Sequence, residues 1–522
     1  MSNQDTIPQT QLLSYISSAT PNSKDKRAPW YKNTAPAYAG IFLWFVFWQE
    51  AVNSATTGGG LVAGLGVALL GLVAAALICH FLFYLVPGLL GMKTGLPLYI
   101  VGTSTFGAKG GFLMPGFLMG VLQFGWLGVN AFFSAQLLAP VIHVPAKVLM
   151  VVWAILAAFV GLKGIQYVAR VATYLPLIPL VTLLILFVKT AGSIGSFDPE
   201  ALGNLHAEVA QTGILTAAPA PAMSTLAVLA FIITTVVGFF ATAGAAGVDF
   251  GLNSRNAKDV SRGGLFGIAL AIILTAGLSA CVVAGVYGNK EYSEKAVASA
   301  KQAVTEAVAQ VDAVVDAAAK AGKPITEDQR ERAKEEKAVA VAHNALYQTP
   351  NLMGVVLGDK LARILWFLLA LAAFPPACFS AFIAANSFKT TLPQVNPFIS
   401  VGIGAAISIV LAVTGLAGDA SGVFKIIGAS FGPICGAMFV DYWLNGKKWS
   451  GPRAGVNPAG WIAWAIGFIV GISTHPKIGA PDEITAPVAA FIVAAVVYYL
   501  CFKIGIRSAV VPVSGALAEA AK

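Results

Sequence analysis

Long apolar segments separated by short polar ones follow one another along almost the whole chain. A helix that crosses a bilayer needs about 20 mostly apolar residues, and about twelve segments approach that length. These predicted spans are residues 38–58, 61–87, 112–139, 146–163, 170–190, 224–247, 263–287, 352–388, 397–417, 421–444, 457–474 and 484–506. The eighth is too long for one span, so we expect its first part, "NLMGVVLGDKLAR", to lie at the membrane interface. The pattern predicts an all-α integral membrane protein.

One polar segment, between the seventh and eighth predicted spans, is much longer than the others. Residues 289–350 are rich in Ala, Lys and Glu, and valines recur there at helical spacing from Val297 to Val315. Further on, "TEDQ", from Thr326 to Gln329, has the pattern of a capping box that opens a second helix. We expect a helical hairpin on the extracytoplasmic side, either as a solvated decoration or as a partner-docking or gating element.

Composition and charge support a membrane protein and narrow its class. Of the 522 residues 57% are hydrophobic and 11% are charged, whereas soluble domains carry roughly 25% charged residues. Lys and Arg gather in one alternating set of loops and in both tails, which predicts cytoplasmic termini. The net charge of +9 is then a topology signal, and we expect no nucleic-acid partner. Because no nucleophile–base pair or metal cluster occurs at membrane depth, we expect a protein that is not an enzyme.

Polar side chains enter the first predicted span, where each must be paired or face water. Gln49 and Glu50 lie in "WQEAVNS", and the following "TTGGG" permits irregular backbone. A helix broken at that depth presents carbonyls and helix ends to ions or polar substrates. The alternative is that Glu50 is held neutral by hydrogen bonds to a neighbouring helix.

Two further spans combine aromatic and polar residues. We number the predicted spans helix 1 to helix 12 in chain order. Gln123, Trp126 and Asn130 lie on one face of helix 3 (residues 112–139), and an indole beside amides suits a planar, hydrogen-bonding heterocycle. Polar contacts between helices explain the same spacing equally well. In helix 6, "TTVVGFFATAGAAG" surrounds Phe239 and Phe240 with small residues. That pattern favours either close helix packing or a second aromatic wall for the same ligand.

The eighth span contains a double proline in "FPPACFSAFIAANSF". Pro375 and Pro376 remove two backbone donors, so the sequence predicts a kink and unpaired carbonyls. A carbonyl and the hydroxyl of Ser380 from such a bend can hold a desolvated cation. The alternative for Ser380 is a hydrogen bond back to its own helix. Asn386 follows two turns later.

These segments resemble the nucleobase–cation symporter family, in its purine–cytosine permease branch, close to cytosine permease. The stretches that carry the resemblance are "GMKTGL", "STFGAKGGFLMPGFLMGVLQFGWLGV", "VVGFFATAGAAGVDFGLNSRNAKD" and "FGPICGAMFVDYWLNGKKW". The resemblance implies a secondary transporter whose first ten helices form two inverted five-helix repeats, with helices 1 and 6 broken and two further C-terminal helices. The expected segments are a cytosolic tail at 1–35, a first transporter segment at 36–288, the insert at 289–350, a second transporter segment at 351–506 and a cytosolic tail at 507–522.

The resemblance also implies site residues. A substrate would lie between Trp126 and Phe240 and would meet Gln123, the backbone near Gly238 and Asn386. With the residues singled out above, the candidate substrate-binding set is Gln49, Glu50, Gln123, Trp126, Asn130, Gly238, Phe239, Phe240 and Asn386. The candidate cation-binding or coupling set is Phe47, Glu50, Ala377, Ser380 and Ala381.

The chain departs from the family pattern in both sets. Ala381 stands where the family has a threonine, and Ala377 stands near an asparagine of the cytosine permease branch. Gln49 and Glu50 occupy a helix that is apolar in the family. We therefore expect Glu50 to face the cavity and take part in proton coupling, because burial favours its neutral form. The alternatives are that it ligates sodium directly or counters a positively charged substrate.

The expected function is cation-coupled symport of a nucleobase or related planar N-heterocycle by alternating access, with H+ or Na+ as the coupling ion and no bound cofactor. The alternatives are an uncoupled facilitator or channel for the same ligand, and a membrane sensor of that ligand. The expected partners are the small heterocycle and membrane lipid. We expect a multi-pass protein of the plasma membrane, or of the bacterial inner membrane if the source is prokaryotic. The sequence leaves the substrate, the ion and the oligomeric state open.

Overall fold

Helices make up nearly all of the described chain. The computed structural model describes residues 12–47, 60–163, 174–212, 224–320, 325–392, 394–418, 420–473 and 485–521. Within these ranges the only β-pairings are two isolated bridges. Nine helices of the described residues are long and apolar enough to cross a membrane, and two shorter apolar helices accompany them. The predicted all-α membrane class is confirmed, while the count of twelve spans and the inverted repeats stay predictions.

The apolar helices follow the predicted spans closely. In chain order they are α2 (Thr34–Phe47), α3 (Leu65–Ile78), α4 (Leu85–Thr94), α7 (Leu118–Ile142), α8 (Ala146–Lys163), α10 (Leu177–Thr190), α12 (Thr225–Ala245), α15 (Ala271–Gly288), α19 (Asp359–Thr391), α20 (Pro397–Val413), α21 (Ala420–Leu444), α22 (Pro458–Ser473) and α23 (Ala486–Lys503). The connecting and terminal helices are α1 (Ser14–Ser17), α5 (Leu98–Val101), α6 (Thr103–Phe106), α11 (Pro199–Ala210), α13 (Gly247–Gly251), α14 (Ala257–Gly264), α16 (Lys290–Lys320), α17 (Glu327–Tyr347), α18 (Thr349–Leu357) and α24 (Gly515–Ala520).

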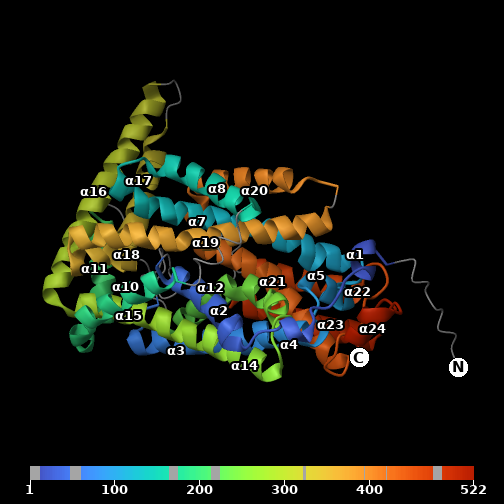
Figure 1. The fold of residues 1–522 in the computed structure, drawn as a ribbon. Helices are drawn as coiled ribbons and strands as arrows, with labels where there is room; N and C mark the ends of the chain where they lie inside the picture. Colours follow the sequence, from blue (N-terminus) through green and yellow to red (C-terminus); the bar gives the residue numbers. More distant parts are fainter. Residues whose placement is uncertain are drawn as a thin grey trace.

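The membrane helices pack in three groups. α7, α8, α19 and α20 contact one another and form the first, which runs along the upper side of Figure 1. The second group contains α2, α3, α12 and α15, and the third contains α21, α22 and α23. α21 packs on α12 and so joins the third group to the second. The first and last helices, α1 and α24, lie at one end of the bundle, and α16 and α17 lie at the other (Figure 1).

The sixth predicted span, helix 6 (residues 224–247), is continuous where a break was expected. α12 is helical from Thr225 to Ala245, so the prediction of a broken helix 6 is wrong for this span. Gly238 serves close packing instead, because a Cβ atom there would lie 2.5 Å from the carbonyl oxygen of Phe424 on α21. Irregular backbone occurs elsewhere, as π-helical turns in the second, third and seventh predicted spans. These turns are η4 (Cys79–Tyr84), η5 (Phe112–Phe117) and η7 (Leu265–Leu270).

The packing at Gly238 makes a testable prediction. We expect Gly238→Ala to lower the free energy of unfolding by about 1–3 kcal/mol, because the added methyl group forces α12 away from α21. The matched control is Gly125→Ala on α7, where a Cβ atom meets nothing within 4 Å. The control is expected to gain about 0.5–1 kcal/mol, because alanine forms helix better than glycine. Thermal unfolding of the purified protein in detergent measures both, and equal losses would contradict the packing argument.

The insert forms the predicted pair of helices, α16 and α17. Thr326 accepts a hydrogen bond from the backbone of Gln329, and the Gln329 side chain accepts one from the backbone of Thr326, so the predicted capping box is present. Arg330 and Lys334 of α17 lie 2.7 Å and 2.9 Å from Asp312 of α16. α18 then forms a separate helix that ends at the left-handed Gly358 (φ +81°), so the overlong eighth segment divides at this glycine.

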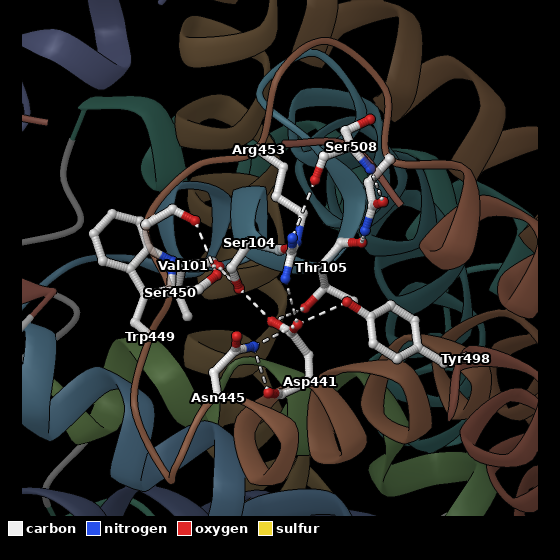
Figure 2. A network of polar contacts seen from close by, with 12 residues as sticks. Val101, Ser104, Thr105, Asp441, Asn445, Trp449, Ser450, Arg453, Tyr498 and Ser508 are labelled. Carbon is white, nitrogen blue, oxygen red and sulfur yellow. Dashed lines mark hydrogen bonds and ion pairs between the residues drawn. The ribbon is translucent and has the colours of Figure 1, made fainter. Parts of the chain in front are cut away.

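A buried polar network ties the C-terminal helices to the short helix α6. The carboxylate of Asp441 on α21 accepts hydrogen bonds from Ser104 of α6 (2.7 Å), Tyr498 of α23 (2.7 Å) and Asn445 (2.8 Å). The guanidinium of Arg453 lies 3.6 Å from the same carboxylate, and both side chains are at most 4% exposed. Figure 2 shows these groups converging on Asp441 from four segments of the chain. The network therefore fixes α21 and α23 against the connection between helices 2 and 3.

Candidate functional site

A cavity of about 660 Å³ lies between α2, α7, α10, α12 and α19. At one end it is lined by Gln123 and Trp126 of α7 and by Phe239 of α12. It extends to two exposed residues, Lys32 at the end of the short helix η3 (Trp30–Lys32) and Pro36 in the first turn of α2. Lys32 is the single charged side chain that lines it among the described residues. A mostly apolar pocket with a few polar groups is typical of sites for small organic ligands.

Two aromatic rings, Trp126 and Phe239, form one wall of the cavity, and a third ring packs behind them. The Trp126 and Phe239 rings meet edge to face with their centroids 5.1 Å apart. Phe424 of α21 stacks on Trp126 at 5.4 Å and meets Phe239 edge to face at 5.6 Å. Phe424 is 2% exposed, so it supports the other two rings from behind.

Phe240 does not take the place that the family resemblance implied. It is fully buried and packs on Tyr38 of α2, with the ring centroids 5.6 Å apart. Phe239 lines the cavity, whereas Phe240, about 100° further round the helix, does not. The aromatic residue of helix 6 that lies beside Trp126 is therefore Phe239, not Phe240. The backbone at Gly238 and Phe239 lies inside the continuous α12, where helical hydrogen bonds use its N–H and C=O groups.

Gln123 presents an amide to the cavity. Its side chain is 6% exposed, and its amide nitrogen donates to the sulfur of Met119 one turn earlier, at 3.6 Å. A thioether is a weak acceptor, and the structure as described gives the Gln123 side chain no other hydrogen-bond partner. A buried amide normally makes stronger hydrogen bonds. Gln123 is therefore suited to hydrogen-bond a polar ligand.

Asn130 lines the cavity, but its amide holds the surrounding helices together. The amide nitrogen donates to the carbonyl of Ala373 on α19 at 2.9 Å. The amide oxygen accepts from the Trp153 indole of α8 at 2.9 Å and from the Ser134 hydroxyl at 3.3 Å. These bonds match the interpretation of polar contacts between helices rather than direct recognition of a ligand.

Removing the Asn130 amide tests this assignment. We expect Asn130→Ala to lower the free energy of unfolding by about 1–3 kcal/mol, because it leaves the Trp153 indole and the Ala373 carbonyl without their buried partner. We expect ligand affinity at 10 °C, where the variant stays folded, to change less than threefold. Thermal unfolding and ligand binding measured on the same preparation check both statements. A loss of affinity without a loss of stability would return Asn130 to the ligand-binding set.

α19 contributes Pro375, Pro376 and Ser380 to the cavity wall. Both prolines lie inside one continuous helix, and because they lack N–H groups, the carbonyls of Leu371 and Ala372 have no helical donor. Ala372 also lines the cavity. The remaining candidate residues of this helix lie elsewhere.

Ala377 and Ala381 face the first helix group instead of the cavity. Both belong to an apolar cluster with residues of α7, α8 and α20. At Gly161 of α8 a Cβ atom would lie 2.9 Å from the Ala381 Cβ atom and 2.5 Å from the carbonyl oxygen of Cys378. Asn386 is exposed near the end of α19 and is not among the lining residues. The structure thus separates Ser380 from the other cation-site and substrate-site candidates of helix 8.

The helix 1 candidates fall outside the geometry described here. Gln49 and Glu50 lie outside the described residues, and Phe47 is the last residue of α2. The coupling role expected for Glu50 therefore stays a prediction.

Sequence reasoning did not find two residues of this site, Met119 and Phe424. Met119 precedes Gln123 by one helical turn on the same face, so the spacing of helix 3 contains the signal. Phe424 comes from α21, which meets α12 and α7 only through tertiary packing. Local patterns along the chain contain no signal for such a contact.

A multi-pass helical membrane protein with a mostly apolar cavity between its helices has the architecture expected of a membrane transporter. The family model described as "Permease for cytosine/purines, uracil, thiamine, allantoin" matches residues 29–307, which is more than half of the chain. The chain belongs to this family of membrane permeases and is a transporter, not an enzyme. A comparison of the sequence with curated proteins finds no match.

Solved transporter structures share the fold. Mhp1 in its inward-facing conformation matches with a TM-score of 0.55 and 14% identity over 98% of both chains. Mhp1, a nucleobase-cation-symport-1 family transporter, in a closed conformation with bromovinylhydantoin bound, matches with a TM-score of 0.54 and 14% identity over 93% of this chain and 94% of that chain. A Na+-coupled sialic acid symporter in a substrate-bound outward-open state matches with a TM-score of 0.54 and 10% identity over 97% and 95%. These similarities show a common fold.

Proposed function

We propose that this permease is a cation-coupled symporter that imports a nucleobase or a related planar N-heterocycle by alternating access. The observation that carries the proposal is the amide of Gln123 beside the Trp126 and Phe239 rings in the cavity. An aromatic ring can stack on a flat heterocycle, and an amide can pair with its polar edge. The substrates for which the family is described and the hydantoin compound bound to Mhp1 have this chemistry.

The coupling step belongs to the same proposal. Ser380 lines the cavity and supplies a hydroxyl, while Ala381 supplies none. We assign proton coupling to Glu50, with H+ rather than Na+ as the first ion to test, and place both termini in the cytoplasm of a plasma-membrane protein. The cavity reaches the exposed residues Lys32 and Pro36 beside the N-terminal segment, which supports a conformation open on the side that this proposal makes cytoplasmic. Joint binding of ion and substrate would favour closure because each adds differential affinity for the closed state.

Uptake by proteoliposomes tests the proposal. Radiolabelled cytosine, uracil, purines, hydantoins, allantoin and thiamine are offered under an imposed pH gradient, a Na+ gradient or neither. The proposal expects at least one heterocycle to accumulate above its external concentration under one gradient, and Glu50→Gln to abolish the proton dependence. Counterflow without accumulation would identify an uncoupled facilitator. Binding without flux of any compound would identify a sensor and overturn transport of this substrate class.

A further inference from the structure

Two histidines and a tyrosine, from two helices distant in sequence, pack together at the end of the bundle where the insert lies. His206 comes from α11, and His343 and Tyr347 come from α17, the second helix of the insert. The imidazole centroids lie 6.2 Å apart, and the tyrosine ring lies 5.5 Å from His206 and 5.0 Å from His343. All three side chains are buried, and His343 and Tyr347 are 0% exposed. This group is called the histidine joint below.

The histidine joint is the buried part of the contact between the insert and α11. The same contact has an exposed rim, where Lys301 of α16 and Glu208 of α11 form an ion pair at 2.5 Å. Exposed ion pairs of this kind stabilise little. Burial of the three rings and of the apolar residues around them therefore provides most of the stability of this contact.

The insert continues directly into α18, which lies against the membrane helices. The Trp366 indole of α19 donates to the carbonyl of Pro350 at 2.9 Å, and Thr349 pairs with Ser279 of α15 at 2.9 Å. α18 also contacts α10 and α2. A change in the position of α17 is thus connected, through one residue, to a helix that touches four membrane helices.

The surroundings of the joint favour neutral imidazoles. Burial, and secondarily the neighbouring His206, lowers the pKa of His343 to about 3. Burial also lowers the pKa of His206, whose Nε2 atom has no hydrogen-bond partner in the described structure. The other ionisable groups at this junction are Tyr287 of α15, which donates to the Leu346 carbonyl at 2.6 Å, and the paired Glu208 and Lys301. Because Glu208 forms its ion pair with Lys301, it does not neutralise a positive charge on either histidine.

The sign of the pH effect follows from these shifts. A histidine outside the joint has a pKa of about 6.5. Because both docked pKa values lie lower, docking is fully favoured above about pH 6.5 and weakens as pH falls below that value. For His343, whose docked pKa is about 3, the population of the undocked insert then rises about tenfold per pH unit below about pH 6.5, and His206 acts in the same direction.

We propose that the histidine joint is an acid-sensitive attachment that releases the insert from α11 when the solution at that end of the bundle becomes acidic. Protonation adds a charge to an apolar junction that holds no unpaired carboxylate among the described residues. Release frees α17 and, through it, changes the restraint on α18. This regulation is separate from the substrate assignment and does not depend on it.

Hydrogen exchange of the full-length protein in lipid nanodiscs tests the proposal between pH 7.5 and pH 5.0. After correction for intrinsic exchange, residues 338–347 are expected to lose about 30-fold in protection, the effect of 1.5 pH units below 6.5 on one histidine. Residues 118–142 of α7 serve as the internal reference and are expected to change less than threefold. Unchanged protection of residues 338–347 would overturn the proposal.

Variants separate the joint from its exposed rim. The double variant His206→Phe and His343→Phe keeps two buried rings without a titrating group, and we expect it to stay protected at pH 5.0. Lys301→Gln removes the rim ion pair and is expected to keep the acid response of the wild type. If the double variant does not fold, His206→Phe alone is compared, with an expected reduction of the response. An acid response of wild-type size in the phenylalanine variant would overturn the proposal.

Discussion

Asp441→Ala is expected to lower the free energy of unfolding by about 3–5 kcal/mol, because it leaves the guanidinium of Arg453 buried without its carboxylate. The substitution also removes the acceptor of Ser104, Tyr498 and Asn445. Chemical unfolding of the purified transporter, followed by tryptophan fluorescence, measures the change. Trp449, whose indole donates to the Val101 carbonyl at 3.0 Å beside this network, is a local reporter.

Two comparisons make the Asp441 result specific. Asp328→Ala removes a carboxylate paired with Arg332 at 3.2 Å, but both side chains are 74% exposed, so we expect a change below about 1 kcal/mol. Replacing Asp441 by Leu and Arg453 by Met together is expected to cost less than Asp441→Ala alone, because no buried charge is left unpaired. Equal losses for Asp441→Ala and Asp328→Ala would show that the network does not hold α21 and α23 in place.

Trp126→Ala is expected to lower substrate affinity about 10- to 100-fold, since stacking of a base on an aromatic side chain contributes about 1–3 kcal/mol. Trp126→Phe keeps a ring and is expected to lose less. Gln123→Ala is expected to lose about tenfold, the effect of one hydrogen bond worth roughly 1.4 kcal/mol. Equilibrium binding of the transported heterocycle to detergent-solubilised protein measures all three.

The neighbouring phenylalanines provide the control for this site. Phe239→Ala is expected to weaken binding, because Phe239 lines the cavity and contacts Trp126. Phe240→Leu is expected to leave affinity within about twofold, while lowering stability by about 1 kcal/mol because Phe240 is buried against Tyr38. A larger loss of affinity for Phe240→Leu than for Phe239→Ala would restore the aromatic pair that the family resemblance implied.

The sequence predicted the features that depend on local pattern. Hydrophobic runs gave the apolar helices, and helical valine spacing with a capping box gave the insert hairpin, because both signals lie within one or two turns. The same is true of the single face that holds Gln123 and Trp126. The orientation of Phe239 relative to Phe240 was not predictable in this way. It depends on how α12 is rotated against α21, which the Gly238–Phe424 contact sets between residues far apart in sequence.

The three cation-site candidates of helix 8 do not share one face toward the cavity, for a related reason. A proline pair and a small-residue motif describe one helix, but they do not say which of its faces meets the cavity. Gly161 of α8 allows Ala381 to approach closely, so that face of α19 is used for helix packing, and of the three candidates on this helix Ser380 is the one that lines the cavity. The buried network around Asp441 was equally invisible, because its members come from four separate segments.

The unbroken course of α12 bears on how selectivity changes over generations. Where main-chain groups hydrogen-bond a ligand, replacement of an amino acid leaves those hydrogen bonds in place, so substrate preference changes slowly. Along α12 the main chain is committed to its own helix, and a bound molecule meets side chains there. A single amino-acid replacement on this helix can therefore alter which compounds are bound. Related transporters with different substrates need not differ in fold.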